Sequence, residues 1–158
     1  MYILNYIKLA EDLRDNKVSE KQQFHYLIGT TIIFGIIYAS RLLPYEGDIK
    51  IALLTDIISL LLMIIGLIVI YRKNQQGDGK HFIERYLCLG FPISIVGFFI
   101  GVLIGGITIA IILMIFGQEG MKDGNIMGVF NITSGLLGTL FILFLFYHGM
   151  IIASNQKK

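Results

Sequence analysis

Apolar residues fill four long runs of this chain, and polar residues gather in the gaps between the runs. The runs cover residues 24–43, 51–71, 89–116 and 127–154. A hydrocarbon layer about 30 Å thick is crossed by about 20 apolar residues in helical conformation, and each run is long enough for this. The pattern therefore predicts an all-α integral membrane protein, in which residues 19–158 form a bundle of four transmembrane helices.

The N-terminal residues show a different pattern, that of a short amphipathic helix over residues 2–15. Its apolar side chains recur every three or four residues, at Ile3, Tyr6, Ile7, Ala10 and Leu13. We expect residues 1–18 to form a separate unit at the cytoplasmic surface of the membrane, either an interfacial anchor or a docking face for a partner. After it, Ser19 and Gln22 have the spacing of a capping box, which predicts a helix start near Glu20.

Composition supports the membrane assignment. The chain of 158 residues is 55% hydrophobic and only 15% charged, and its mean hydropathy is +0.74. Too little amphipathic sequence remains to cover four apolar helices in water, which excludes a soluble helical protein. The single cysteine, Cys88, has no partner for an internal disulfide and is expected to pack as a small apolar residue.

The basic residues predict an orientation, because cytoplasmic loops carry an excess of lysine and arginine. Three of them fall in the first and third loops, at Arg41, Lys50 and Lys122. The other ten fall in the N-terminal segment, the second loop and the tail: Lys8, Arg14, Lys17, Lys21, Arg72, Lys73, Lys80, Arg85, Lys157 and Lys158. We therefore expect both termini to be cytoplasmic in the inner (plasma) membrane of a bacterial cell.

Small residues form a stripe along the third run. They follow one another at helical spacing, at Gly90, Ser94, Gly97, Gly101, Gly105 and Thr108. A matching stripe on the fourth run contains Gly128, Asn131, Gly135 and Gly138. Small residues let transmembrane helices approach closely, as in GxxxG motifs. The stripes are consistent with packing inside the bundle, with contacts in a homo-oligomer, or with the lining of a pore.

Asp56 is the only acidic residue inside a run, and a lone carboxylate there is costly unless it is paired, protonated or hydrated. Thr55 and Ser59 are its polar neighbours on the same run, and Asn131 is expected at similar depth. Three interpretations remain open: an ion pair with Arg41 that joins the first two helices, proton or cation handling, and extension of the side chain to water.

No catalytic or metal-binding pattern is present in the sequence. His148 lies within the fourth run, far from other metal-ligating residues, and is expected to be neutral and hydrogen-bonded. The runs contain no nucleophilic elbow and no pair of histidines or carboxylates, so we expect neither an enzyme nor a bound cofactor. Basic residues are scattered and balanced by acidic ones, which makes nucleic acid an unsuitable partner.

These features favour a non-enzymatic accessory subunit, embedded in the lipid bilayer, that self-associates through its glycines. It would serve as membrane subunit, anchor or sensor for a cytosolic protein partner, in a bacterial defence or stress system. The residues expected to face that partner are Arg72, Lys73, Lys80 and Arg85. Two alternatives are an oligomeric small channel or transporter with a polar path around Asp56, and an immunity protein against a membrane-inserting toxin.

Overall fold

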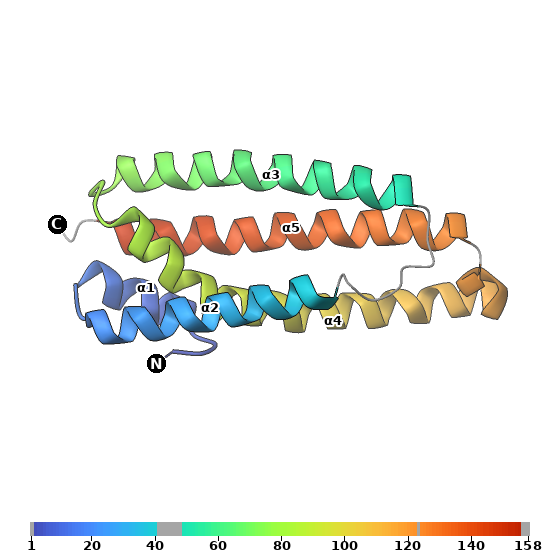
Figure 1. Cartoon of the computed structure of the whole chain (residues 1–158), viewed down its shortest axis with the longest axis horizontal. Helices are drawn as coiled ribbons and strands as arrows, with labels where there is room; N and C mark the ends of the chain where they lie inside the picture. Colours follow the sequence, from blue (N-terminus) through green and yellow to red (C-terminus); the bar gives the residue numbers. More distant parts are fainter. Residues whose placement is uncertain (1, 41–48, 123, 156–158) are drawn as a thin grey trace.

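The computed structural model describes residues 2–40, 49–122 and 124–155, which contain five helices (Figure 1). The helices are α1 (Tyr6–Arg14), α2 (Glu20–Ser40), α3 (Ile49–Gln76), α4 (Phe82–Lys122) and α5 (Gly124–Ser154). The residues described contain no β-strand. The prediction of an all-α protein is confirmed.

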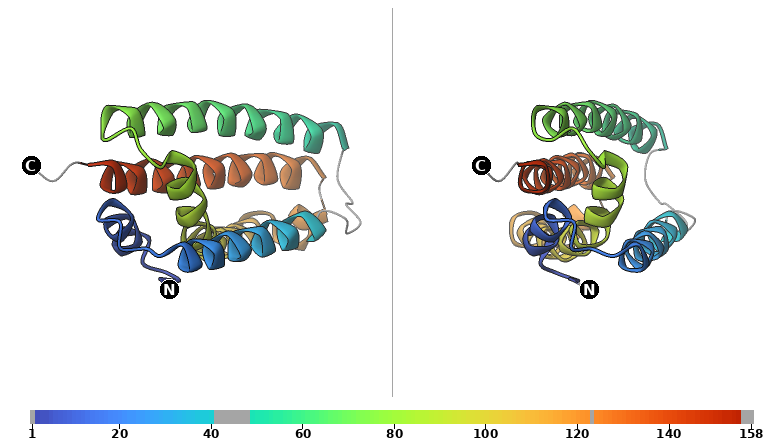
Figure 2. Two further views of the ribbon diagram at one scale, coloured as in Figure 1. Left: turned by 60° about the vertical axis from the view of Figure 1, so that its left-hand side comes forward. Right: turned by 90° about the vertical axis from the view of Figure 1, so that its left-hand side faces the viewer.

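The four long helices lie side by side as an open arc rather than a closed bundle. α3 packs on α5, α5 packs on α4, and α4 packs on α2, so the spatial order is α3–α5–α4–α2. The end-on view in Figure 2 shows α3 and α2 at opposite edges of this arc. Of the consecutive long helices, only α4 and α5 pack extensively on each other, whereas α2 packs on α4 and α3 packs on α5.

α1 lies across one end of the arc, the end at which both chain termini are found (Figure 1). We call this the terminal end. Of the predicted apolar face, Ala10 and Leu13 are buried, together with Leu9, which was not predicted. Ile3 and Ile7, also expected on that face, are exposed, and α1 begins only at Tyr6. The three buried side chains join a core cluster that includes Leu89 of α4 and Met150 of α5, both fully buried. The buried face of α1 is thus covered by the protein's own helices.

A capping box starts α2, as the sequence predicts. The backbone amide of Ser19 donates to Oε1 of Gln22 at 3.1 Å, and the amide of Gln22 donates to Oγ of Ser19 at 3.4 Å. These two bonds satisfy amides that the first turn of a helix leaves without partners. Helix α2 accordingly begins at Glu20.

Within the described residues, three helices are long and apolar enough to cross a membrane. These segments are Leu53–Gln76, Phe82–Glu119 and Gly128–Ser154. Many of their apolar side chains, especially those of Leu53–Gln76, are exposed rather than covered by other helices, as expected when the surrounding medium is lipid. The chain is therefore a membrane protein. The predicted first crossing, residues 24–43, is not among the three, and α2 carries the polar Glu20, Lys21 and Gln22 in its first turn.

α4 is longer than the apolar run that predicted it. It begins at Phe82, so Pro92 lies inside the helix rather than at its start. Near its other end the backbone leaves helical geometry at Gly117, where φ is 63° and ψ is −160°. Glycine suits this position because other residues are strained at such angles. The break ends the straight part of α4 one turn before the connection to α5.

Candidate functional site

A glycine-lined cleft lies between α4 and α5. Its volume is about 220 Å³, and its lining residues are Gly97, Ile100, Gly101, Ile104, Gly105, Ser134, Gly135, Gly138 and Phe141. The stripes predicted on the third and fourth apolar runs thus meet along one shared surface. The cleft exists because five of its lining residues are glycines, which have no side chain to fill the space between α4 and α5.

The stripe on α4 divides into a packed part and an open part. A Cβ atom added to Gly90 would lie 3.2 Å from Cγ2 of Thr30, and one added to Gly97 would lie 3.0 Å from Cγ1 of Ile142. These two glycines therefore serve close packing on α2 and α5. By contrast, no heavy atom lies within 4 Å of such a Cβ at Gly101, Gly105 or Gly138. Among the residues that the structure describes, no neighbour occupies the space beside these three glycines.

The other small and polar residues of the two stripes are partly or fully covered. Ser94 is half-buried, whereas Thr108 and Gly128 are buried. The side chain of Asn131 lies outside the described part of the structure. Packing inside the protein thus covers small residues of the stripes toward both ends of α4 and α5, whereas Gly101, Gly105 and Gly138 between them have open space beside them.

The polar residues around Asp56 do not share one direction. Thr55 is half-buried, and its Cγ2 lies 3.9 Å from the position of a Cβ added to Gly135 on α5. Ser59 is also half-buried, whereas Asp56 is exposed on α3. The predicted ion pair between Asp56 and Arg41 lies outside the described residues.

His148 joins α5 to α1. Its Nδ1 lies 3.2 Å from the hydroxyl oxygen of Tyr6 in a hydrogen bond, and the two rings meet edge to face with centroids 6.1 Å apart. Phe144, one turn earlier on α5, stacks on the other side of the imidazole. The prediction that this histidine is hydrogen-bonded is confirmed, and its partner attaches the N-terminal helix to the bundle.

A buried ion pair closes the loop between α3 and α4. The guanidinium group of Arg85 donates from Nη1 to Oδ1 of Asp78 at 2.5 Å and from Nη2 to Oδ2 at 2.6 Å. Nη1 also donates to Oδ1 of Asn74 at 3.0 Å and to the carbonyl oxygen of Lys80 at 2.9 Å. Both Arg85 and Asn74 are buried. Such bidentate, charge-assisted bonds hold a planar guanidinium in one orientation.

The turn that brings Asp78 within reach of Arg85 depends on the glycines on either side of it, Gly77 and Gly79. A Cβ added to Gly77 would lie 2.3 Å from the carbonyl oxygen of Ser154, and that same carbonyl accepts a hydrogen bond from the amide of Asp78 at 3.0 Å. Gly79 has a φ of 68°, which glycine adopts without strain. The loop therefore lies directly against the end of α5.

Arg85 also determines the titration of its partner. Its hydrogen bonds hold the pKa of the Asp78 carboxyl below the ordinary value of 3.8, against the opposing effect of partial burial. Because Asp78 stays ionised at neutral pH, the buried charge of Arg85 is compensated. The cluster is a structural clamp that joins α3, α4 and α5 at the terminal end.

The four residues expected to face a partner therefore differ in position. Arg72 and Lys80 are exposed, and Lys73 is half-buried. Arg85, expected on the surface with them, is instead only 2% exposed and bound to Asp78. Its role was missed because a charged residue between two apolar runs is usually solvated. The glycines on either side of Asp78, which favour a tight return of the chain, were the available signal.

In the described part of the chain, no three histidine, cysteine, aspartate or glutamate side chains gather in a metal-binding arrangement. Cys88 is buried in the core cluster beneath α1. Comparison of the chain with family models, with curated proteins and with solved structures finds no match. The open cleft and the charged terminal end are thus the features from which a function has to be argued.

Proposed function

We propose that this protein is a non-catalytic membrane subunit that crosses the bilayer four times and self-associates through the glycine-lined cleft. One observation carries the proposal: Gly101, Gly105 and Gly138 border a cleft, and within the described residues no heavy atom lies within 4 Å of a Cβ added to any of the three. In lipid, helices associate through close backbone contact over small residues. A helix of a second copy is the occupant that such a surface fits.

The four-span count rests on α2 as the remaining crossing. α2 runs for 21 residues alongside α4, and both chain termini lie at the same end of the protein, which suits an even number of crossings. The excess of lysine and arginine at this end supports a cytoplasmic location for both termini. The terminal end thus faces the cytosol in our proposal.

Self-association gives the protein a means to bring cytosolic partners together. The face of α1 that carries Leu9 is already covered by α4 and α5, so a partner would bind the polar surface of the terminal end. Exposed charges there include Lys8 and Glu11 on α1 and Lys80 in the loop before α4. This combination favours a membrane anchor or sensor over an isolated transport unit.

The test replaces one glycine of the cleft and one neighbour. Gly105→Leu would place an isobutyl group in the cleft, whereas Gly106→Leu would place it on the adjacent position of α4, which has equal free space but does not line the cleft. We expect Gly105→Leu to convert the complex to monomers in lipid nanodiscs, measured by native mass spectrometry, and Gly106→Leu to retain it. Equal oligomer distributions in both variants and in the native protein would overturn the proposal.

A further inference from the structure

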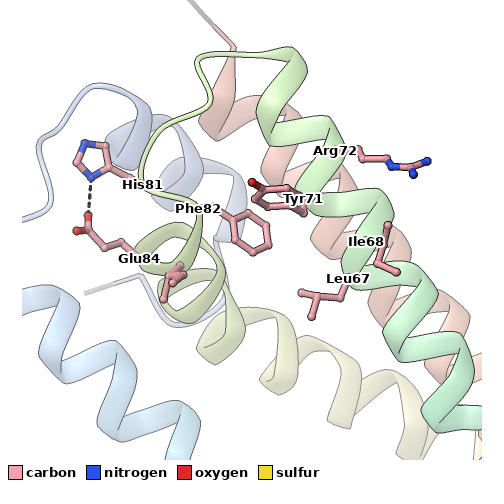
Figure 3. A pocket seen from close by; sticks show the side chains of 8 residues that line it. Leu67, Ile68, Tyr71, Arg72, His81, Phe82 and Glu84 are labelled. Carbon is pink, nitrogen blue, oxygen red and sulfur yellow. Dashed lines mark hydrogen bonds and ion pairs between the residues drawn. The ribbon is translucent and has the colours of Figure 1, made fainter.

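An apolar groove separates α3 from the start of α4 at the terminal end (Figure 3). Its walls are formed by Leu67, Ile68 and Tyr71 on one side and by Phe82 and Ile83 on the other. The groove has a volume of about 830 Å³, within the range of about 300–1,000 Å³ that is typical of ligand pockets. It is distinct from the glycine-lined cleft, which lies between α4 and α5.

The groove exists because α3 packs on α5 and leaves its other side uncovered. The two walls meet where the rings of Tyr71 and Phe82 contact edge to face, with centroids 5.1 Å apart. Ile83 is 70% exposed and Tyr71 is 47% exposed. An exposed apolar surface of this kind fits an apolar occupant.

The rim of the groove is positively charged. Arg72 lines the rim on α3, Lys73 follows it, and Lys80 is exposed in the loop. None of the three forms a salt bridge with another described residue. The carboxylate on the opposite rim, Glu84, lies 3.0 Å from Nδ1 of His81 and keeps its charge where this histidine is neutral. The other nearby carboxylate, Asp78, is bound to Arg85, so Arg72, which lines the groove, and the neighbouring Lys73 and Lys80 outnumber Glu84.

We infer that this groove binds an anionic phospholipid of the leaflet at the terminal end, with an acyl chain along the apolar walls and the phosphate at Arg72. The arrangement matches an amphiphile, since the apolar walls lie within the candidate spans and the cations lie at their ends. Arginine suits phosphate because its planar guanidinium donates two parallel hydrogen bonds. A transmembrane helix of a partner would match the walls but would leave the cationic rim without a counter-charge.

The chain contains no tryptophan, so a single introduced tryptophan is an unambiguous reporter of nearby lipid. Phe82→Trp places the reporter in the groove wall. Phe24→Trp is the matched control, because Phe24 is exposed near the start of α2, away from the groove. Each variant is reconstituted in mixtures of brominated phosphatidylglycerol and phosphatidylcholine with identical acyl chains, and the relative affinity for the two lipids is obtained from the quenching of fluorescence.

We expect Phe82→Trp to prefer phosphatidylglycerol severalfold and Phe24→Trp to show no preference. Adding Arg72→Gln to Phe82→Trp should reduce the preference about fivefold, the effect of one cation near an anionic lipid surface. Adding Lys8→Gln, which removes an exposed cation of α1 at the same end, should leave the preference unchanged. If Phe82→Trp does not fold, Ile83→Trp at the exposed rim of the same wall replaces it.

Two results would overturn the inference. Equal quenching of the groove reporter by both lipids would mean that the groove is ordinary lipid-facing surface. Absence of quenching by either lipid, with normal quenching of the control, would mean that a protein segment fills the groove. Gly105 lines the cleft and not the groove, so the lipid preference can also be measured in the Gly105→Leu variant. A retained lipid preference in this variant would support the groove whether or not the protein self-associates, so the two proposals can fail separately.

Discussion

Asp78 binds Arg85 through both of its carboxylate oxygens, and the pair lies at the point where three helices meet. The amide of Asp78 is bonded to the last turn of α5 through the carbonyl oxygen of Ser154. Asn74, in the last turn of α3, accepts from the same guanidinium. One ion pair therefore fixes the connection between α3 and α4 against the end of α5.

Replacing Asp78 should destabilise the protein strongly. Asp78→Asn leaves the guanidinium of Arg85, which is 2% exposed, without its counter-charge, and removing one partner of a buried ion pair costs about 3–5 kcal/mol. We expect a clear fall in the thermal midpoint in detergent. The reaction of Cys88 with a thiol-reactive dye provides the measurement, because this one cysteine is buried in the folded protein.

The control for this prediction is Lys8→Gln. Lys8 pairs with Glu11 and Asp12 on the surface of α1, and its side chain is 46% exposed. Exposed ion pairs contribute about 0–1 kcal/mol, so this variant should melt close to the native protein. If Asp78→Asn also melted close to the native protein, the buried ion pair would not be what holds the terminal end together.

The same ion pair predicts a dependence of stability on pH. The pKa of Asp78 is lowered in the folded protein from 3.8 by the hydrogen bonds from Arg85. Its contribution is therefore complete above the unfolded pKa and is lost as the pH falls through the lower, folded pKa. We expect the temperature of the thermal midpoint, measured by circular dichroism, to decrease as the pH is lowered below about 4.

Asp12 has a lowered pKa for a similar reason, since it accepts a hydrogen bond from the hydroxyl of Tyr2. Both carboxylates therefore contribute to acid sensitivity in the same direction. The difference between the native protein and Asp78→Asn isolates the contribution of Asp78. This difference should shrink as the pH is lowered from 5 to 2, and a constant difference would contradict the assignment.

A third prediction concerns Gly77, which lies against Ser154, the last residue of α5. Gly77→Ala would place a methyl group 2.3 Å from the carbonyl oxygen of Ser154, a backbone atom that cannot turn aside. We expect a loss of about 1–3 kcal/mol, the usual cost of overpacking. Gly35→Ala on α2, where no atom lies within 4 Å, should instead be neutral or stabilising by up to about 1 kcal/mol. Comparable midpoints for the two variants would exclude the close contact.

A fourth prediction tests how α1 is held. Leu9 is fully buried against the terminal end, whereas Ile7 on the same helix is 43% exposed. Truncation of a buried leucine costs about 2–5 kcal/mol. We expect Leu9→Ala to loosen α1 and to accelerate labelling of Cys88 in the same core cluster, while Ile7→Ala labels at nearly the native rate. Equal rates would mean that α1 does not cover this cysteine.

The helices themselves were predictable from sequence because hydropathy is a local property. The runs at 51–71 and 127–154 fall inside α3 and α5, and the apolar period of the N-terminal segment predicted the burial of Ala10 and Leu13 on α1, but not that of Leu9. The capping box at Ser19 and Gln22 fixed the start of α2. Each of these signals depends only on residues within a few turns of one another.

What could not be predicted is which neighbour covers each face. Gly97 and Gly101 have the same residue type and lie on the same stripe, yet Ile142 packs on the first and no atom approaches the second. The period of a stripe shows which residues share a face and contains no information about the facing helix. Arg85 was misplaced for the same reason, since its burial depends on a turn that brings Asp78 back to it.

The position of α2 and α3 at opposite edges of the arc has a consequence for biosynthesis. Of the four long helices, these two are synthesised first, and each has its main packing surface on a helix that is made later, α4 for α2 and α5 for α3. A nascent chain that stops at Lys80 would insert segments with no extensive interface between them. Assembly of the native structure therefore waits for the C-terminal half, whose helices α4 and α5 must pack between α2 and α3 after both have been synthesised.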